Sequence, residues 1–206
     1  FTIGNTLTIG IYNPLGRNVT VELIGADNSS IGSGTTTGTS IAGFKTTAMV
    51  NNLYASIPSA TSGTYKVKVT YGQQSTTKTG GTYSINTSAC TPTISSVTYQ
   101  DTNSSVVSVT GNDQKIVRNN STVRYTASGL SAKHSATIAS CSIAVNGHTY
   151  ALTVSGTSAT GGNASIDSGT DVQAVFTLTD SRGLTATKTI TVHMLDWSVP
   201  SAIITL

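Results

Sequence analysis

The sequence is poor in charge. Lysine, arginine, aspartate and glutamate make up 9% of its 206 residues, and Glu22 is its only glutamate; soluble proteins typically contain ~25% charged residues. The net charge of +3 comes from scattered lysines and arginines. Because nucleic-acid-binding proteins normally carry a clustered basic stripe, no nucleic-acid partner is expected.

Long hydrophobic runs are also missing. None of the apolar stretches approaches the ~20 residues that a membrane-spanning helix needs, so no membrane partner is expected. The chain opens on Phe1 and ends at Leu206 inside an apolar stretch. These ends predict that the sequence is a piece of a longer protein.

Two cysteines, Cys90 and Cys141, are too few for a disulfide-rich scaffold. Asn146-Gly147 is a strong signal for a two-residue hairpin turn, and that turn places Cys141 opposite Leu152 on an apolar face. Cys141 is therefore expected to be a buried small hydrophobic residue, and no disulfide is expected. A Cys90–Cys141 bridge remains the alternative, because the sequence does not fix the distance between the two Cα atoms.

What the sequence does contain is threonine, serine, valine and isoleucine, a composition typical of β-structure. The clearest segment is Asp171 to Met194. Two stretches with alternating apolar residues flank the turn Asp180-Ser181-Arg182-Gly183. The apolar face of such a hairpin needs a second sheet to cover it. We therefore predict an all-β fold of two tandem immunoglobulin-like β-sandwich modules.

The first module is expected to span residues 1–88. Strands are predicted at 6–12, 19–24, 64–71 and 82–86. Residues 29–43 are expected to form a loop with a short strand at Ile31, and residues 72–81 are expected to be rich in turns. In the third of these strands Tyr65, Val67, Val69 and Tyr71 should point inward. Apolar residues between Met49 and Ile57 recur at helical spacing, which predicts a short helix near 47–55 capped by Thr46 or Thr47.

The second module is expected to span residues 89–198, after a linker at 87–93. Its seven predicted strands are 94–100, 105–110, 122–127, 138–145, 148–155, 172–178 and 184–194. Residues 199–206 repeat the form of the start of this module. They are expected to begin a further module or to form a docking strand.

No motif for catalysis, cofactor binding or metal binding is present. The histidines His134, His148 and His193 lack zinc-site spacing, and Gly161-Gly162 is interpreted as a flexible loop. Asp167 and Asp171 are near neighbours, but they are equally typical of a loop. Asp101-Thr102-Asn103 and Asn112-Asp113 offer oxygen atoms without the spacing of a calcium loop. The chain is expected to be no enzyme, with no catalytic residues, no metal and no cofactor.

Aromatic side chains are the weak candidates for ligand binding, because a ring can stack on the face of a sugar. Tyr12, Tyr99 and Trp197 lie near the ends of the predicted modules. For Trp197, packing against other residues of the protein is the alternative.

The segment TDSRGLTATKTITV with the following Trp- and Pro-containing linker resembles immunoglobulin-like modules of phage tail proteins. FTIGNTLTIGIYNPLGRNVTVELIG and NNLYASIPSATSGTYKVKVTYG resemble a tail- or baseplate-associated, receptor-binding protein of streptococcal siphophages, a family long described only as a domain of unknown function. The resemblance covers the whole chain and supplies no catalytic residues.

This resemblance implies non-enzymatic structural and adhesion modules in the virion, at the tip of the phage tail. Their expected partners are other tail or baseplate proteins and the cell-wall polysaccharide at the outer surface of the host. The full-length protein could form an oligomer. Two alternatives stay open: a repeat segment of a bacterial surface adhesin or stalk, and an accessory domain of a cell-wall hydrolase.

Overall fold

The computed structural model describes residues 1–197. They divide into two compact units. Unit 1 comprises residues 1–91, 132–137 and 181–184, and unit 2 comprises residues 92–131, 138–180 and those from 185 onward. The expectation for residues 199–206 lies outside the described residues. Within the described residues, no helix combines the length and apolar character needed to cross a membrane.

Unit 1 is a small sandwich of two antiparallel sheets. One sheet has the order β3-β2-β5-β6, and the other pairs β1 with β4. The strands are β1 (Leu7–Gly10), β2 (Val19–Ile24), β3 (Ser30–Thr36), β4 (Ser40–Gly43), β5 (Ser62–Tyr71) and β6 (Gln74–Ser84). Val21 and Leu23 of β2 are fully buried, and Leu7 and Ile9 of β1 cover the core from the opposite sheet.

The predicted helix is confirmed as α1 (Thr47–Ala55). Its N-cap is Thr46, whose hydroxyl accepts a hydrogen bond from the backbone N–H of Met49. Leu53 and Tyr54 are the buried residues of α1. The predicted linker contains a second short helix, α2 (Thr87–Cys90), and Cys90 belongs to the core of unit 1.

The loop predicted at residues 29–43 is wrong except for the short strand expected at Ile31, because β3, which contains Ile31, and β4 occupy most of this segment. A side chain at Gly32 would come within 2.5 Å of Met49 of α1, and one at Gly34 within 2.7 Å of Ile41 of β4. Side chains of α1 and β4 thus pack over the glycines of β3. For this reason the sequence of β3 does not alternate between apolar and polar residues. The turn-rich stretch predicted at 72–81 is wrong beyond the turn at 72–73, because β6 pairs with β5 from Gln74 onward.

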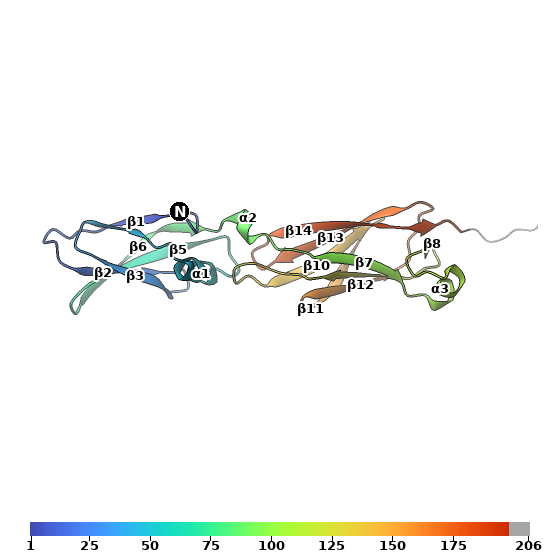
Figure 1. Cartoon of the computed structure of the whole chain (residues 1–206), viewed down its shortest axis with the longest axis horizontal. Coiled ribbons are helices and arrows are strands. Elements are labelled where there is room, and N and C mark those ends of the chain that lie inside the picture. The colour runs from blue at the N-terminus through green and yellow to red at the C-terminus, as the bar shows by residue number, and fades with distance from the viewer. Residues whose placement is uncertain (198–206) are drawn as a thin grey trace, which may run out of the picture. The chain divides into compact units, whose positions relative to one another are not determined.

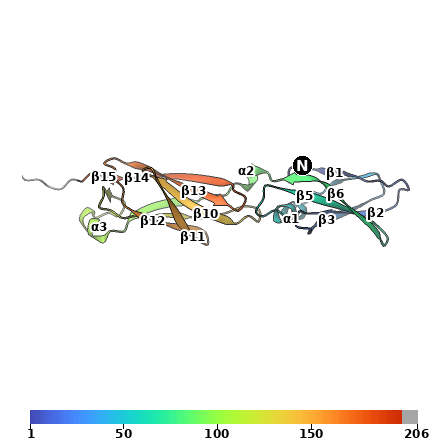
Figure 2. The same cartoon turned by 180° about the vertical axis from the view of Figure 1, so that it is seen from behind.

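Unit 2 is an immunoglobulin-like β-sandwich. Its main sheet has the strand order β14-β13-β10-β11-β12-β9-β7. If these seven strands are lettered A to G in chain order from β7 to β14, they match the two layers of that fold, A-B-E-D and G-F-C. The third and fourth strands, β10 and β11, are joined as a hairpin that links the two layers. Figures 1 and 2 show β13 with β14 in one layer and β11 with β12 in the other. The expected all-β sandwich fold is confirmed.

The strands of this sheet are β7 (Ser96–Asp101), β9 (Val123–Ser128), β10 (Ile138–Val145), β11 (His148–Ser155), β12 (Ser158–Ala164), β13 (Val172–Asp180) and β14 (Thr185–Val192). A short parallel pair, β8 (Ile116–Val117) with β15 (Met194–Leu195), lies beside it. The alternation predicted for β13 is confirmed, since Ala174, Phe176 and Leu178 are fully buried.

The hairpin register predicted from Asn146-Gly147 is also confirmed. Val145 pairs with His148, and Cys141 pairs with Leu152. Asn146 and Gly147 both have positive φ, as a type I′ turn requires.

Two predictions for unit 2 are wrong. The strand expected at 105–110 is the helix α3 (Ser104–Thr110), which begins at the cap residue Asn103 and ends at Gly111 with φ 64°. The glycines expected in a flexible loop at 161–162 belong to β12, which pairs with both β11 and β9.

Candidate functional site

The candidate site of unit 1 is an exposed aromatic and basic surface at the end of its sandwich. The loop from Ile11 to Asn18 presents it on one side. The side chain of Asn13 is buried and holds this loop together: its Nδ2 donates to the carbonyl oxygens of Arg17 (2.8 Å) and Thr37 (3.1 Å), and its Oδ1 accepts from the backbone N–H of Arg17 (3.1 Å). Because Asn13 points inward, its neighbour Tyr12 projects outward and is 94% exposed.

The β5–β6 turn supplies the other side of this surface. Tyr71 is the last residue of β5, pairs with Gln74, and is half-exposed. The prediction that Tyr71 points into the core is wrong, because the strand has passed the end of the core at this position. The guanidinium carbon of Arg17 lies 5.9 Å from the centre of the Tyr71 ring, which is within the range of a cation–π contact.

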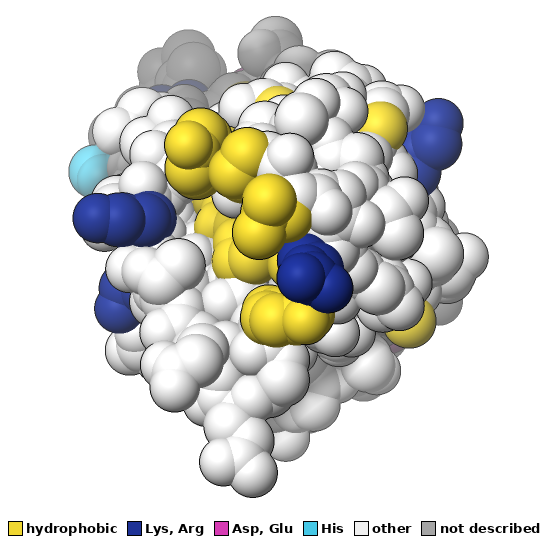
Figure 3. Space-filling model, turned by 90° about the vertical axis from the view of Figure 1, so that its left-hand side faces the viewer, with side chains coloured by type: hydrophobic (Ala, Val, Ile, Leu, Met, Phe, Trp, Pro, Cys, Tyr) yellow, Lys and Arg dark blue, Asp and Glu magenta, His cyan; other side chains and the backbone are white. Residues whose placement is uncertain are grey.

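We call Tyr12, Leu15, Arg17, Tyr71 and Gln74 the loop-end surface. They line a shallow groove of about 350 Å³. A wider groove of about 600 Å³ adjoins it and shares Tyr12 with it; its walls include Ile11, Tyr65 and Lys78. Figure 3 shows hydrophobic side chains gathered on this end of unit 1, with Lys and Arg side chains beside them and no acidic side chain on the face in view.

This arrangement suits the binding of a polar polymer chain. Exposed rings offer flat apolar faces, and the arginine and glutamine offer hydrogen-bond donors and a positive charge. The grooves are open, so a chain can enter and leave along them. An exposed apolar patch rimmed by polar groups commonly marks an interaction site.

The three aromatic candidates from the sequence have different environments. Tyr12 is in the loop-end surface. Tyr99 is buried in unit 2, where its hydroxyl donates to the carbonyl oxygen of Gln114 (2.9 Å) and accepts from the backbone N–H of His193 (3.0 Å). The ring of Tyr99 is therefore not available to a ligand. Trp197 is half-exposed in unit 2, beside an apolar cavity of about 210 Å³ that Val106 and Val109 also line.

The aspartates predicted as weak catalytic or calcium candidates have structural partners. Asp167 accepts from Arg118 Nε at 2.7 Å, and this hydrogen bond is the main reason that its pKa is lowered. The pKa of Asp171 is lowered by the backbone N–H of Met194 and then by the ring of His193. Asp101 Oδ1 accepts from the backbone N–H groups of residues 103 and 122. In residues 1–197, no three His, Cys, Asp or Glu side chains are grouped as metal ligands.

The alternative of a Cys90–Cys141 disulfide is wrong. Both residues are thiols, and they are buried in the cores of different units. Burial raises the pKa of the Cys141 thiol, which keeps it protonated and unreactive.

Sequence reasoning identified Tyr12 but missed Arg17, Tyr71 and Gln74. The loop at 11–18 and the turn at 72–73 are more than fifty residues apart in the sequence. Only the antiparallel pairing of β2 with β5 brings these segments to the same end of the sheet. No local signal could have found this set of residues.

No protein-family model and no curated protein matches the chain. Among solved structures, it is similar to one described as a 1.5-MDa bacterial ice-binding adhesin, with 18% identity and a TM-score of 0.34 over 96% of this chain and 61% of that one. It is also similar to a PcdhgB3 EC1-4 structure, with 16% identity and a TM-score of 0.29 over 66% of this chain and 32% of that one. The chain thus spans less than two thirds of either structure, and likenesses at these scores carry no argument about function.

Proposed function

We propose that the chain is a pair of non-enzymatic adhesion and spacer modules of a phage tail-tip protein. The loop-end surface of unit 1 is the part that contacts the cell-wall polysaccharide of a streptococcal host. The full-length protein then works in the virion, where it associates with other tail or baseplate proteins. The resemblance of the sequence to streptococcal siphophage proteins supports the biological setting.

The observation that carries the adhesion role is the exposure of Tyr12 beside Arg17 and Tyr71. A ring that is 94% exposed gains nothing from the fold of unit 1, because almost none of its apolar area is removed from water. Its neighbour Leu15 is 76% exposed as well. A partner that covers both residues would remove this area from water and stabilise the complex.

The basic residues of the loop-end surface indicate what the partner carries. Arg17 has a planar guanidinium that can bind carboxylate or phosphate groups with two parallel hydrogen bonds. Lys78 lines the adjoining groove. An anionic or phosphate-bearing cell-wall polysaccharide fits this combination of rings and cations.

The test is the binding of fluorescently labelled protein to a panel of streptococcal strains, with and without removal of the cell-wall polysaccharide. Staining should be strain-selective and should disappear with the polysaccharide. Tyr12→Ala should weaken it at least about twofold, since a stacked aromatic contributes ~0.5–1.5 kcal/mol beyond its buried area. The matched control is Val109→Ala, because Val109 is 88% exposed but belongs to unit 2.

Equal staining by wild type and Tyr12→Ala would show that another surface binds the cell wall. Absence of staining on every strain would leave only the spacer role for this chain.

A further inference from the structure

The wider groove of unit 1 has a free strand edge as one of its walls. The strand is β1, which pairs with β4 on one side only. The consecutive residues 8–12, in and directly after β1, line this groove of about 600 Å³, whereas β5 lines it with the alternate residues Tyr65, Val67 and Val69. Alternate residues share one face of a strand, and consecutive residues are reached together along its edge. The edge of β1 is therefore a wall of the groove, and one face of β5 is its floor.

The core of unit 1 is covered incompletely under this groove. Val21 and Leu23 of the inner strand β2 are fully buried. Their partners on the same face of β5, Val69 and Val67, are only partly buried. The cover that the sheet of β1 and β4 gives to the larger sheet thus ends between β2 and β5.

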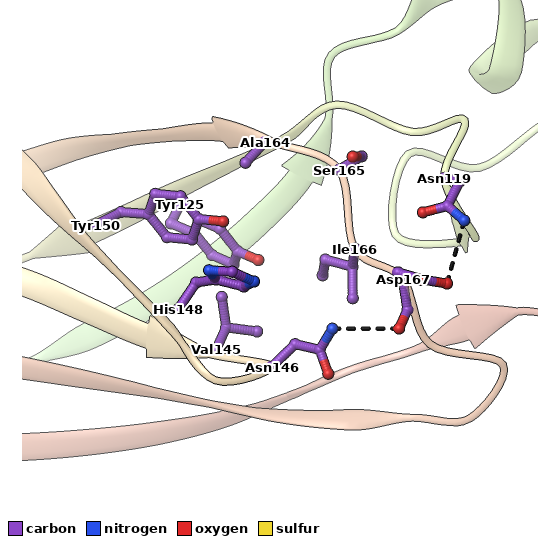
Figure 4. Close-up of a pocket in the computed structure, with 10 residues that line it drawn as sticks. All are labelled: Asn119, Tyr125, Val145, Asn146, His148, Tyr150, Ala164, Ser165, Ile166 and Asp167. Atoms are coloured by element: carbon purple, nitrogen blue, oxygen red, sulfur yellow. Dashed lines mark hydrogen bonds between the residues drawn. The ribbon is translucent and has the colours of Figure 1, made fainter.

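Unit 2 shows a sandwich whose layers are complete. It has layers of four and three strands, whereas unit 1 has layers of four and two. Ala174, Phe176 and Leu178 on the inward face of β13 are all fully buried. The polar pocket of unit 2 lies beside its turns and loops, where Asn146 donates a hydrogen bond to the backbone oxygen of Asp167 (Figure 4). In unit 1 the open space instead runs along a strand, where a third strand of the smaller layer would lie.

The backbone of β1 directs polar groups toward this space. Ile11 donates its N–H to the carbonyl oxygen of Thr39 at 2.8 Å, which continues the antiparallel pairing of β1 with β4. Hydrogen-bonded residues alternate along such a pair, so the N–H and C=O groups of Thr8 and Gly10 point away from β4. Among residues 1–197, neither of these two residues makes a backbone hydrogen bond with another segment. An unpaired edge of this kind is a template for a further strand.

Lys78 of β6 indicates the chemistry of the strand that fits. Lys78 pairs with Val67, so its side chain lies on the inward face of the sheet, and it lines the groove. None of the ion pairs among the described residues includes Lys78. An inward-facing charge disfavours pairing with an uncharged apolar strand, such as β1 of a second copy. A strand that carries a carboxylate would instead complement it.

We propose that this groove binds a β-strand of a partner protein, which pairs with the free edge of β1. The strand has apolar residues at alternate positions, which cover Tyr65, Val67 and Val69, and an acidic residue that faces Lys78. In such strand addition, main-chain hydrogen bonds supply affinity and the alternate side chains supply specificity. Since a strand rises ~3.3 Å per residue, residues 8–11 offer about 13 Å of edge, enough for a segment of four or five residues. The proposal does not depend on the polysaccharide proposed for the loop-end surface.

The test is a titration of the full chain with two acetylated and amidated peptides, TVTETVT and TVTKTVT, followed by amide hydrogen exchange in NMR. The glutamate peptide should slow the exchange of the Thr8 and Gly10 amides. It should bind at least about threefold more tightly than the lysine peptide, and Lys78→Glu should reverse this preference.

A pair of variants at residue 10 tests the main-chain pairing. Gly10→Pro removes the N–H that points into the groove without removing a hydrogen bond to β4, so unit 1 should stay folded. Gly10→Ala keeps this N–H, and its new Cβ would meet no atom within 4 Å. The glutamate peptide should bind Gly10→Ala at least about fivefold more tightly than Gly10→Pro.

Four results would overturn the proposal. Neither peptide slows the exchange of the two amides, the two variants at residue 10 bind the peptide equally, or Lys78→Glu still prefers the glutamate peptide. The fourth is slow exchange of these amides in a dimer of the chain alone, detected by light scattering, which would assign the edge to a second copy. The titration contains no polysaccharide, so its failure and the failure of the cell-staining experiment are separate outcomes.

Discussion

Removing the hydroxyl of Tyr83 should destabilise unit 1, because this group is the centre of a buried hydrogen-bond chain. Tyr83 lies in β6 and is 1% exposed. Its hydroxyl accepts from the backbone N–H of Ala26 at 3.1 Å and contacts Ser56 Oγ, the C-cap residue of α1. Ser56 Oγ donates its own proton to the carbonyl oxygen of Leu53 at 2.8 Å, so Tyr83 must be the donor to Ser56.

The cost of Tyr83→Phe follows from the groups that it leaves behind. Ser56 Oγ, which is buried, loses its donor, and the N–H of Ala26 loses its acceptor in a partly buried position. A buried polar group left without a partner costs ~1–3 kcal/mol, so the free energy of unfolding of unit 1 should fall by about that amount. In a domain of 60–100 residues, each kcal/mol lowers the Tm by about 4–8 °C.

The assay is urea denaturation followed by circular dichroism, for Tyr83→Phe, Ser56→Ala and the double variant. Because both single changes remove the same hydrogen bond, the double variant should cost less than the sum of the two by ~0.5–3 kcal/mol. Amide exchange of Ala26 should accelerate in Tyr83→Phe. The matched comparison is Tyr125→Phe, whose hydroxyl has no protein partner among the described residues and whose loss should change stability little. A cost of Tyr83→Phe no larger than that of Tyr125→Phe, or simple additivity with Ser56→Ala, would refute the hydrogen-bond chain.

Two further predictions concern unit 2. Gly162→Ala should lower its free energy of unfolding by about 2–4 kcal/mol, because residue 162 has a positive φ and the new Cβ would clash with the Tyr125 ring. The control is Gly111→Ala, which also has a positive φ but no atom within 4 Å of the new Cβ, and it should cost about 1 kcal/mol. Equal costs of the two variants in urea denaturation would contradict the packing argument. The pKa of Asp171 is lower in the folded state than its value of ~3.9 in the unfolded chain. The ionised carboxylate therefore stabilises unit 2 fully at pH values above ~3.9, and this stabilisation is lost as the pH falls through the lower pKa of the folded state. Asp171→Asn should therefore be less stable than wild type at pH 7 and lose this disadvantage at low pH, as urea midpoints across the pH range would show; a constant difference would contradict the assignment.

The elements that could be predicted from sequence are those whose own residues carry the signal. The hairpin at Asn146-Gly147 has a turn that only a few residue pairs can form and apolar residues at every second position of its strands, so its register follows. Helix α1 has its capping threonine and its apolar spacing in the same short segment. In each case the local sequence and the packed structure agree.

The errors have the opposite cause. The serine- and valine-rich segment 104–110 has strand-like composition, but its ends decide its structure: Asn103 caps the first turn, and Gly111 ends the helix in the left-handed conformation. None of its residues is buried, so no packing acts against the helix. Strand β12 has few apolar residues and is held by backbone hydrogen bonds to a neighbour on each side, which composition does not reveal.

The candidate site was predictable only in part for a related reason. Tyr12 is a candidate from the sequence because it is an aromatic residue near the end of a predicted module. Its companions Tyr71 and Gln74 come from a different hairpin. Sites built from several loops become visible only when the sheet that positions those loops is known.

The state of the two cysteines bears on where the chain can fold. Each core holds one cysteine as a thiol, and no disulfide joins Cys90 to Cys141. Its stability consequently does not depend on an oxidant during synthesis or on protection from reductants afterwards. The same native structure can form in a reducing cell interior and persist in an oxidising medium outside, without a chemical step between the two.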